Sequence, residues 1–244
     1  MLRPLLITVA ALIFAGPVSM AAAQMSTPNS NQMSSNAPIE AQFERPDDHV
    51  IGAIDAPLLM VEYGSYACGH CARFESEVWP MIKTEFIDTG AVRFIFRPML
   101  TPPAQIAGAG IIASECAAED QYFTVSEALF AGQRRILSTM QAQGDVLAVY
   151  NDIVAPAGLT PEALLVCLQD PAMNQQAGER AQQAIDDGVS GTPSFIIRGK
   201  ILTLNRDGYF HWGEDVLLID GEPMPQSLDQ DSFRRIIEHF QAMP

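Results

Sequence analysis

Two cysteines separated by a glycine and a histidine carry the clearest chemical signal in the chain. They are Cys68 and Cys71, with Gly69 and His70 between them. A short apolar run at 58–63 precedes them, and residues 68–87 place apolar side chains three and four positions apart, which predicts a strand followed by a helix. Cys68 is therefore expected at a helix N-terminus, where unpaired N–H groups and the helix dipole stabilise an anion.

This position indicates redox chemistry at a thiol. The helix terminus and the neighbouring His70 both lower the pKa of Cys68, which makes it the expected nucleophile. Cys71 lies about one turn further along and suits a resolving thiol that attacks a mixed disulfide. Two other interpretations remain open. One is half of a zinc site, although the sequence offers no second ligand pair, and the other is a permanent structural disulfide.

Glu62 and the Thr192-Pro193 dipeptide are further candidates for the site. Glu62 lies in the apolar run, where a carboxylate is costly unless it is used. It is expected either to relay the proton of Cys71 through a raised pKa or to face solvent at a strand end. Pro193 precedes a strand-like segment at 194–198. A cis bond there turns the Thr192 backbone towards an incoming peptide, whereas a trans bond is an ordinary strand start.

The elements that must position these residues follow from hydrophobic periodicity. A second strand at 91–96 completes a β-α-β unit with parallel strands, and Pro80 predicts a kink near Trp79 in the helix between them. The rest of the chain is predicted as a helical block at 103–118, 121–131, 145–155, 160–169 and 171–187, then strands at 194–198 and 216–221, and a final amphipathic helix at 231–241.

Composition and the first residues limit the function. Of the 244 residues, 48% are hydrophobic, and the net charge of −15 argues against a nucleic-acid binder and against docking on anionic lipid by charge. Residues 1–23 are predicted to be a signal peptide cleaved after Ala23, because the apolar run at 5–16 is shorter than the roughly 20 residues of a membrane span. An uncleaved anchor is the alternative. Residues 24–42 are predicted to be a flexible leader.

These segments together resemble the DsbA-like thiol–disulfide oxidoreductases. The similarity rests on 52–57 (GAIDAP), 61–74 (VEYGSYACGHCARF) and 191–195 (GTPSF), and extends over 43–241. It implies an α/β thioredoxin fold (βαβ…ββα) with an inserted all-helical subdomain: 43–100 as the first half, 101–188 as the insert and 189–244 as the second half. It also implies that Cys68 attacks, Cys71 resolves, Pro193 is cis and Glu62 is the family's buried acid.

The chain departs from the family in two places. Gly69-His70 replaces the usual Pro-His dipeptide, which leaves the direction of electron flow open between an oxidase and an isomerase or reductase. Residues 200–215 look like an insertion with a hairpin turn at 205–208 and an aromatic cluster. This insertion either widens the peptide-docking surface or packs its aromatic side chains on its own domain.

The other two cysteines, Cys116 and Cys167, fall in the predicted helical block. Four cysteines allow three pairings, and with Cys68 and Cys71 as the redox pair the remaining bond is Cys116–Cys167. Some members of the family carry a second disulfide in the helical domain, and these positions look similar to theirs. The alternative is two buried free thiols that act as small apolar residues.

The resulting hypothesis is a periplasmic thiol–disulfide oxidoreductase that introduces disulfides into secreted proteins. Its substrates are unfolded or reduced proteins that contact Gly69, Thr192 and Pro193. The exchange chemistry needs no cofactor and no metal, nucleic acid is not a partner, and the resemblance implies a membrane redox partner that reoxidises the pair. The alternatives are an isomerase or reductase that uses the same cysteines, a non-redox chaperone, and a metal carrier that binds through Cys68, His70 and Cys71.

Overall fold

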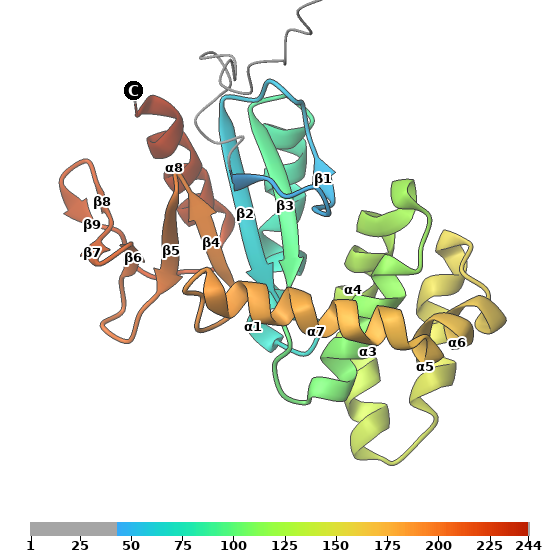
Figure 1. The fold of residues 1–244 in the computed structure, drawn as a ribbon. Helices are drawn as coiled ribbons and strands as arrows, with labels where there is room; N and C mark the ends of the chain where they lie inside the picture. Colours follow the sequence, from blue (N-terminus) through green and yellow to red (C-terminus); the bar gives the residue numbers. More distant parts are fainter. Residues whose placement is uncertain (1–42, 244) are drawn as a thin grey trace, which may run out of the picture. The chain divides into compact units, whose positions relative to one another are not determined.

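A seven-stranded mixed sheet organises the part of the chain that the computed structural model describes, residues 43–243 (Figure 1). The predicted signal peptide at 1–23 and leader at 24–42 lie outside the described residues. The spatial order of the strands is β1 (Val50–Ile51), β3 (Val92–Pro98), β2 (Leu58–Gly64), β4 (Ser194–Ile197), β5 (Lys200–Leu204), β6 (Phe210–Trp212) and β7 (Asp215–Val216). Strands β2 and β3 are parallel, and the other pairs are antiparallel.

Alternation along β2 decides which side chains reach the redox pair. Leu58 and Met60 join the hydrophobic cluster that contains Cys71, whereas Leu59, Val61 and Tyr63 join the cluster on the opposite face. Successive side chains of a strand point to opposite faces, so Glu62 shares the face of Leu58 and Met60. The strand therefore directs a carboxyl group towards the helix that follows it.

That helix is interrupted, as the sequence predicts. Helix α1 (Gly69–Glu77) ends at Val78, and α2 (Trp79–Ile82) begins immediately after it and continues into a π-helical turn, Lys83–Ile87. Pro80 has no N–H to donate and its ring clashes with the preceding turn, which accounts for the break at Val78 and Trp79. The kink predicted near Trp79 is confirmed.

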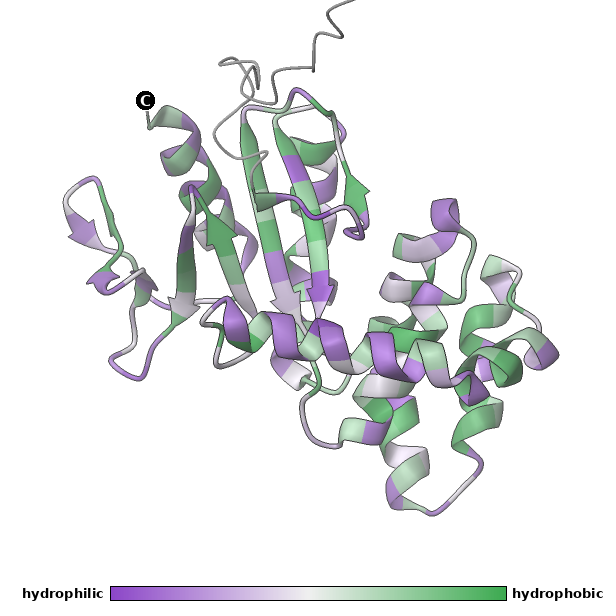
Figure 2. Cartoon of the chain, viewed as in Figure 1, coloured by the Kyte–Doolittle hydropathy of each residue, from purple (hydrophilic) through white to green (hydrophobic). Residues whose placement is uncertain are grey.

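Five helices lie between β3 and β4, which confirms a thioredoxin fold with a helical insertion. They are α3 (Ala104–Glu115), α4 (Tyr122–Gln141), α5 (Val146–Val154), α6 (Pro161–Gln169) and α7 (Pro171–Asp186). Helix α7 runs from this group back to the sheet, where it contacts β3 (Figure 1). Figure 2 shows that the strands β2 and β3 are mostly hydrophobic, while α7 is hydrophilic along much of its length. Within 43–243, every helix is too short or too polar to span a bilayer.

Helix α4 is longer than predicted. The sequence predicted a helix over 121–131, but α4 continues across Gly132 to Gln141. A Cβ atom at Gly132 would lie 2.3 Å from Cδ1 of Ile153 on α5. The glycine therefore permits the close approach of α5, and the tertiary contact outweighs the weak helix propensity of glycine.

A disulfide joins Cys116, at the end of α3, to Cys167 on α6. The bond closes a loop of 51 residues, and loops of this length stabilise a fold by about 2–4 kcal/mol. We expect the double variant Cys116→Ala, Cys167→Ala to lose about that much unfolding free energy in urea titrations with the Cys68–Cys71 pair oxidised. The double variant avoids a lone thiol that would exchange with Cys68. An unchanged urea midpoint would show that the bond adds no stability.

The second half of the fold differs from the predicted strand at 216–221. The strand is interrupted at Leu217, whose backbone bonds to Phe210 and Met224. Strand β8 (Leu218–Ile219) then turns back onto β9 (Glu222–Pro223) as a separate two-stranded sheet. Asp220 and Gly221 both have positive φ, at 57° and 83°, which closes this tight turn. The chain then ends in α8 (Gln230–Ala242).

Residues 200–215 fold as a hairpin, with β5 and β6 joined by a turn at 205–208. Two of its aromatic rings pack on α8: Phe210 against Phe233, with ring centroids 5.8 Å apart, and Trp212 against Phe240, at 5.2 Å. Tyr209 remains 39% exposed. Phe210 and Trp212 therefore pack on their own domain.

Candidate active site

Cys68 caps α1 and faces the loop that precedes β4. Its backbone is extended (φ −88°, ψ 120°), as is usual for an N-cap residue, and its carbonyl accepts a hydrogen bond from the N–H of Ala72 at 3.1 Å. The Cys68 thiol donates to the carbonyl of Thr192 at 3.4 Å. Both active-site cysteines are free thiols in this structure, Cys68 partly exposed and Cys71 buried.

The two thiols have opposite acidities. A hydrogen bond from the Cys71 thiol, together with the Thr192 side chain and the N–H groups of Cys71 and His70, lowers the pKa of Cys68 to about 5, against the effect of its partial burial. Burial raises the pKa of Cys71 well above its usual value, and hydrogen bonding to Cys68 and the charge of Glu62 add to that rise. His70 therefore acts on the sulfur through its backbone N–H, whereas the sequence had implicated its side chain. Cys68 is therefore the more acidic thiol of the pair, and Cys71 stays protonated.

Glu62 lies inside the protein. Its exposed fraction is 0%, so the alternative in which it faces solvent at a strand end is wrong. Neither carboxyl oxygen has a hydrogen-bond partner. Burial is the largest cause of a raised pKa at Glu62, followed by the charges of Glu75 and Cys68. A neutral carboxylic acid without a partner is suited to exchange protons with a nearby thiol.

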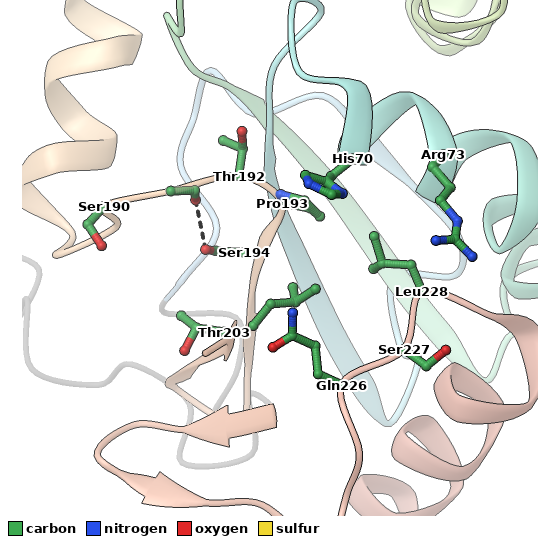
Figure 3. A pocket seen from close by; sticks show the side chains of 12 residues that line it. His70, Arg73, Ser190, Thr192, Pro193, Ser194, Thr203, Gln226, Ser227 and Leu228 are labelled. Atoms are coloured by element: carbon green, nitrogen blue, oxygen red, sulfur yellow. Dashed lines mark hydrogen bonds between the residues drawn. The ribbon is translucent and has the colours of Figure 1, made fainter. Parts of the chain in front are cut away.

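The peptide bond between Thr192 and Pro193 is cis. This loop presents the Thr192 carbonyl to the Cys68 sulfur and lines a cavity of about 430 Å³ beside the cysteine pair. His70 and Arg73 reach the cavity from α1, Gln226 and Leu228 from the segment before α8, and Thr203 from β5 (Figure 3). Hydroxyl and amide groups make up much of this lining.

Gln133 is a positioning residue that the sequence reasoning missed. Its side chain is 5% exposed, and Nε2 donates to the carbonyls of Tyr66 and Cys68, both at 2.9 Å. The residue belongs to α4, so the helical insertion holds the redox loop directly. The sequence did contain a signal: Gln133 is in phase with the buried Leu129, Phe130 and Ile136 of that helix.

The sequence-predicted residues divide into two groups. The first group lies within or beside this site and comprises Cys68, Cys71, Glu62, Gly69, His70, Thr192 and Pro193. The second is the Cys116–Cys167 disulfide, which belongs to the helical insertion. Within the described range 43–243, no cluster of three or more His, Cys, Asp or Glu side chains has the arrangement of a metal site. The thiols of Cys68 and Cys71 are the reactive groups that the described site offers.

Comparison with known proteins places this geometry in a family. A family model described as Thioredoxin matches residues 44–209. A putative protein-disulfide oxidoreductase of Rickettsia bellii is 27% identical, over 63% of this chain and 58% of its own length. Disulfide bond formation protein D of Bacillus subtilis is 26% identical, over 63% of this chain and 68% of its own length. The match thus spans less than two thirds of the Rickettsia relative.

One solved structure extends the comparison to the fold. A variant of alpha-DsbA1 from Wolbachia pipientis superimposes with a TM-score of 0.63 at 24% identity. The superposition covers 81% of this chain and 92% of the Wolbachia chain. The shared fold includes the helical insertion, because the coverage leaves too little of either chain to omit it.

Proposed function

This chain belongs to the thioredoxin family and is similar to its DsbA-like members, and from that premise we propose that it is a thiol–disulfide oxidoreductase that introduces disulfides into secreted proteins. The observation that carries the proposal is the Cys68 pKa of about 5 beside a buried, protonated Cys71. We assign the catalytic roles to Cys68, Cys71, His70 and Glu62, and substrate contact to Gly69, Thr192 and Pro193. Residues 43–100 and 189–244 form the thioredoxin domain in this proposal, and 101–188 the insert.

The reaction begins with the Cys68–Cys71 disulfide. A substrate thiolate attacks Sγ of Cys68 and forms a mixed disulfide, and the sulfur of Cys71 leaves with the electron pair of the broken bond and takes up a proton. The second substrate thiolate then attacks the substrate's own sulfur and expels Cys68 as a thiolate. Two electrons have passed from the substrate dithiol to the pair, and the substrate keeps a disulfide.

The acidity of Cys68 supports the oxidising direction. A thiol of low pKa is a good leaving group, and its thiolate stabilises the reduced protein, which favours transfer of the disulfide to the substrate. An isomerase or reductase is the second candidate, because Gly69 stands where DsbA-like proteins usually carry proline. Both functions use the same cysteines and differ in their reduction potential.

We propose the periplasm as the location and a membrane oxidase as the partner that reoxidises the pair. The N-terminal pattern at 1–23 supports export, and the Cys116–Cys167 disulfide suits an oxidising compartment. The membrane oxidase is the partner that the family resemblance implies.

The direct test of the function is a refolding assay. The oxidised protein, mixed with an equimolar amount of a reduced and unfolded dithiol protein, is expected to transfer its disulfide nearly completely, as measured by mass spectrometry after acid quenching. Strong reduction of insulin by the dithiol form, together with weak transfer in the forward direction, would favour the reductase. Absence of exchange in both directions would overturn the proposal.

Glu62→Gln separates the role of the buried acid in catalysis from its effect on stability. The raised pKa keeps Glu62 protonated in the folded state while the unfolded chain ionises, so the wild type loses stability as pH rises above about 4.5. We expect the variant to be more stable than the wild type at pH 7 and equal to it near pH 4. We also expect Cys71 to resolve a glutathione mixed disulfide at Cys68 about 10-fold more slowly, because the carboxyl group that relays its proton is gone.

Quenched-flow mass spectrometry of the glutathione adduct measures that step, and thermal unfolding between pH 4 and pH 8 measures the stability. The variant Ser76→Ala, an exposed change on the same helix as the cysteines, is the control for general disturbance of α1. Equal rates of adduct resolution in the wild type and the Gln variant would remove Glu62 from the mechanism.

A further inference from the structure

A second groove borders the redox pair, between α1 and α4. Its volume is about 990 Å³, and it is more than twice as large as the cavity beside Pro193. Gly69, which directly follows Cys68, lies at the α1 side of the lining, and residues from Phe130 to Gln141 form the α4 side. We call this the α1–α4 groove.

The groove is basic on a strongly acidic protein. Arg73, Arg134 and Arg135 line it, opposed by a single carboxylate, Glu77. The whole chain has 29 acidic and only 14 basic residues. Three arginines in one groove are therefore a local reversal of the charge that dominates the rest of the surface.

The three arginines differ in their ion-pair partners. Arg73 pairs with Glu77 at 3.0 Å, and Arg135 pairs with Asp152 at 2.5 Å, both in exposed positions. Arg134 is exposed and, among residues 43–243, has no ion pair or hydrogen bond from its side chain. Exposed pairs of this kind add little to stability, so the fold does not account for this cluster.

We propose that the α1–α4 groove binds the acidic flank of the polypeptide whose cysteine reacts with Cys68. This inference rests on the proposed function, because the bound segment is part of the redox substrate. A polypeptide joined to Sγ of Cys68 must continue past the N-terminus of α1, and Gly69 is where the groove meets that point. Arg134 is available to carboxylates in the groove, since no existing ion pair has to break.

The charge pattern also favours one orientation of a bound acidic polypeptide. The acidic remainder of the surface repels an acidic polypeptide in most orientations, so the groove favours the orientation that brings its cysteine to Cys68. An anionic bilayer offers the same charges but a flat surface, and it does not fill a concave groove between two helices. The geometry therefore favours a polypeptide over a membrane.

The test uses two peptides of equal length with one cysteine each, flanked on both sides by three Glu residues or by three Gln residues. The rate at which each peptide forms a mixed disulfide with the oxidised protein is measured in low salt by quenched-flow mass spectrometry. The Glu-to-Gln rate ratio is then compared between wild type and Arg134→Glu. The intrinsic reactivity of each peptide cancels, because both proteins meet the same two thiols.

We expect the Glu-to-Gln ratio to fall about 3- to 10-fold in Arg134→Glu, and the difference between the proteins to shrink in 1 M NaCl. Arg235→Glu is the matched control: Arg235 is exposed on α8, lines neither cavity and undergoes the same change of charge. Its ratio is expected to equal that of the wild type.

Three results would overturn the inference. One is an equal ratio in wild type and Arg134→Glu. Another is an equal fall in Arg235→Glu, which would reflect net charge alone. The third is Arg134-dependent sedimentation with phosphatidylglycerol vesicles without any change in the peptide ratio, which would assign the groove to a membrane. Failure of both peptides to react would instead overturn the proposed function on which the inference rests.

Discussion

Cys68→Ser abolishes disulfide transfer, whereas Cys71→Ser leaves a protein that holds its partner in a covalent complex. The first variant removes the only partly exposed thiol of the pair, and with it the sulfur that a substrate can reach. The second keeps the acidic Cys68 but removes the buried thiol that resolves the mixed disulfide. We expect at least a 1,000-fold loss of transfer rate in the first variant, on the order of the loss of an essential nucleophile.

Both effects are read from one experiment. Each reduced variant is mixed with oxidised glutathione and the adducts are counted by mass spectrometry: one stable adduct is expected on Cys71→Ser and none on Cys68→Ser. The double variant Cys116→Ala, Cys167→Ala is the control, because it removes cysteines outside the site. A stable adduct on Cys68→Ser, or transfer by that variant at the wild-type rate, would reverse the assigned roles.

The stability of the reduced protein is expected to rise with pH relative to that of the oxidised protein. Only the reduced protein has a thiol at Cys68, and folding lowers its pKa from 9.0 to about 5. A lowered pKa stabilises the fold fully above the unfolded value and loses that effect as pH falls through the folded value. The slope stays below about 1.4 kcal/mol per pH unit between pH 5 and pH 9, because solvent screens the partly exposed thiolate.

Urea titrations of both redox forms at several pH values between 4 and 9 measure this difference. The comparison is made across pH rather than at one value, because the Cys68–Cys71 bond itself changes the stability of the oxidised form by an amount that does not depend on pH. The variant Cys68→Ala has no thiol at this position, so its stability relative to the oxidised wild type is expected to show no such rise with pH. A difference between the two forms that stays constant from pH 5 to pH 9 would contradict a thiolate at Cys68.

Hydrophobic pattern predicted most of the helices and strands, while the thioredoxin fold itself was implied by the family resemblance. The apolar run of β2 and the helical spacing in α1 indicated the βαβ unit, and Pro80 indicated the break between α1 and α2. The prediction was poorer where tertiary contact decides the element. The two-residue strand β1 is too short to show alternation, and the apolar run at 216–219 gives no sign that the strand is interrupted at Leu217.

The residues of the candidate site were likewise predicted only in part. Local chemistry predicted the acidic thiol, because a helix start and a cysteine spacing are both visible in the sequence. A raised pKa at Glu62 was one of two alternatives, since the sequence gives a residue's face in a strand but not what covers it. Gln133 and the segment with Gln226 are far from Cys68 in sequence and reach the site only through the packing of α4 and the loop before α8.

The rate of alkylation of Cys68 by iodoacetamide, followed from pH 3 to pH 10 in the reduced protein, tests the central claim most directly. Only the thiolate reacts, so the midpoint of the profile reports the pKa of this sulfur. Peptide mapping assigns the adduct to Cys68, and Cys71, buried and protonated, is expected to remain unmodified. The structure predicts a midpoint near pH 5. A midpoint near pH 9, the ordinary value for a cysteine thiol, would contradict it.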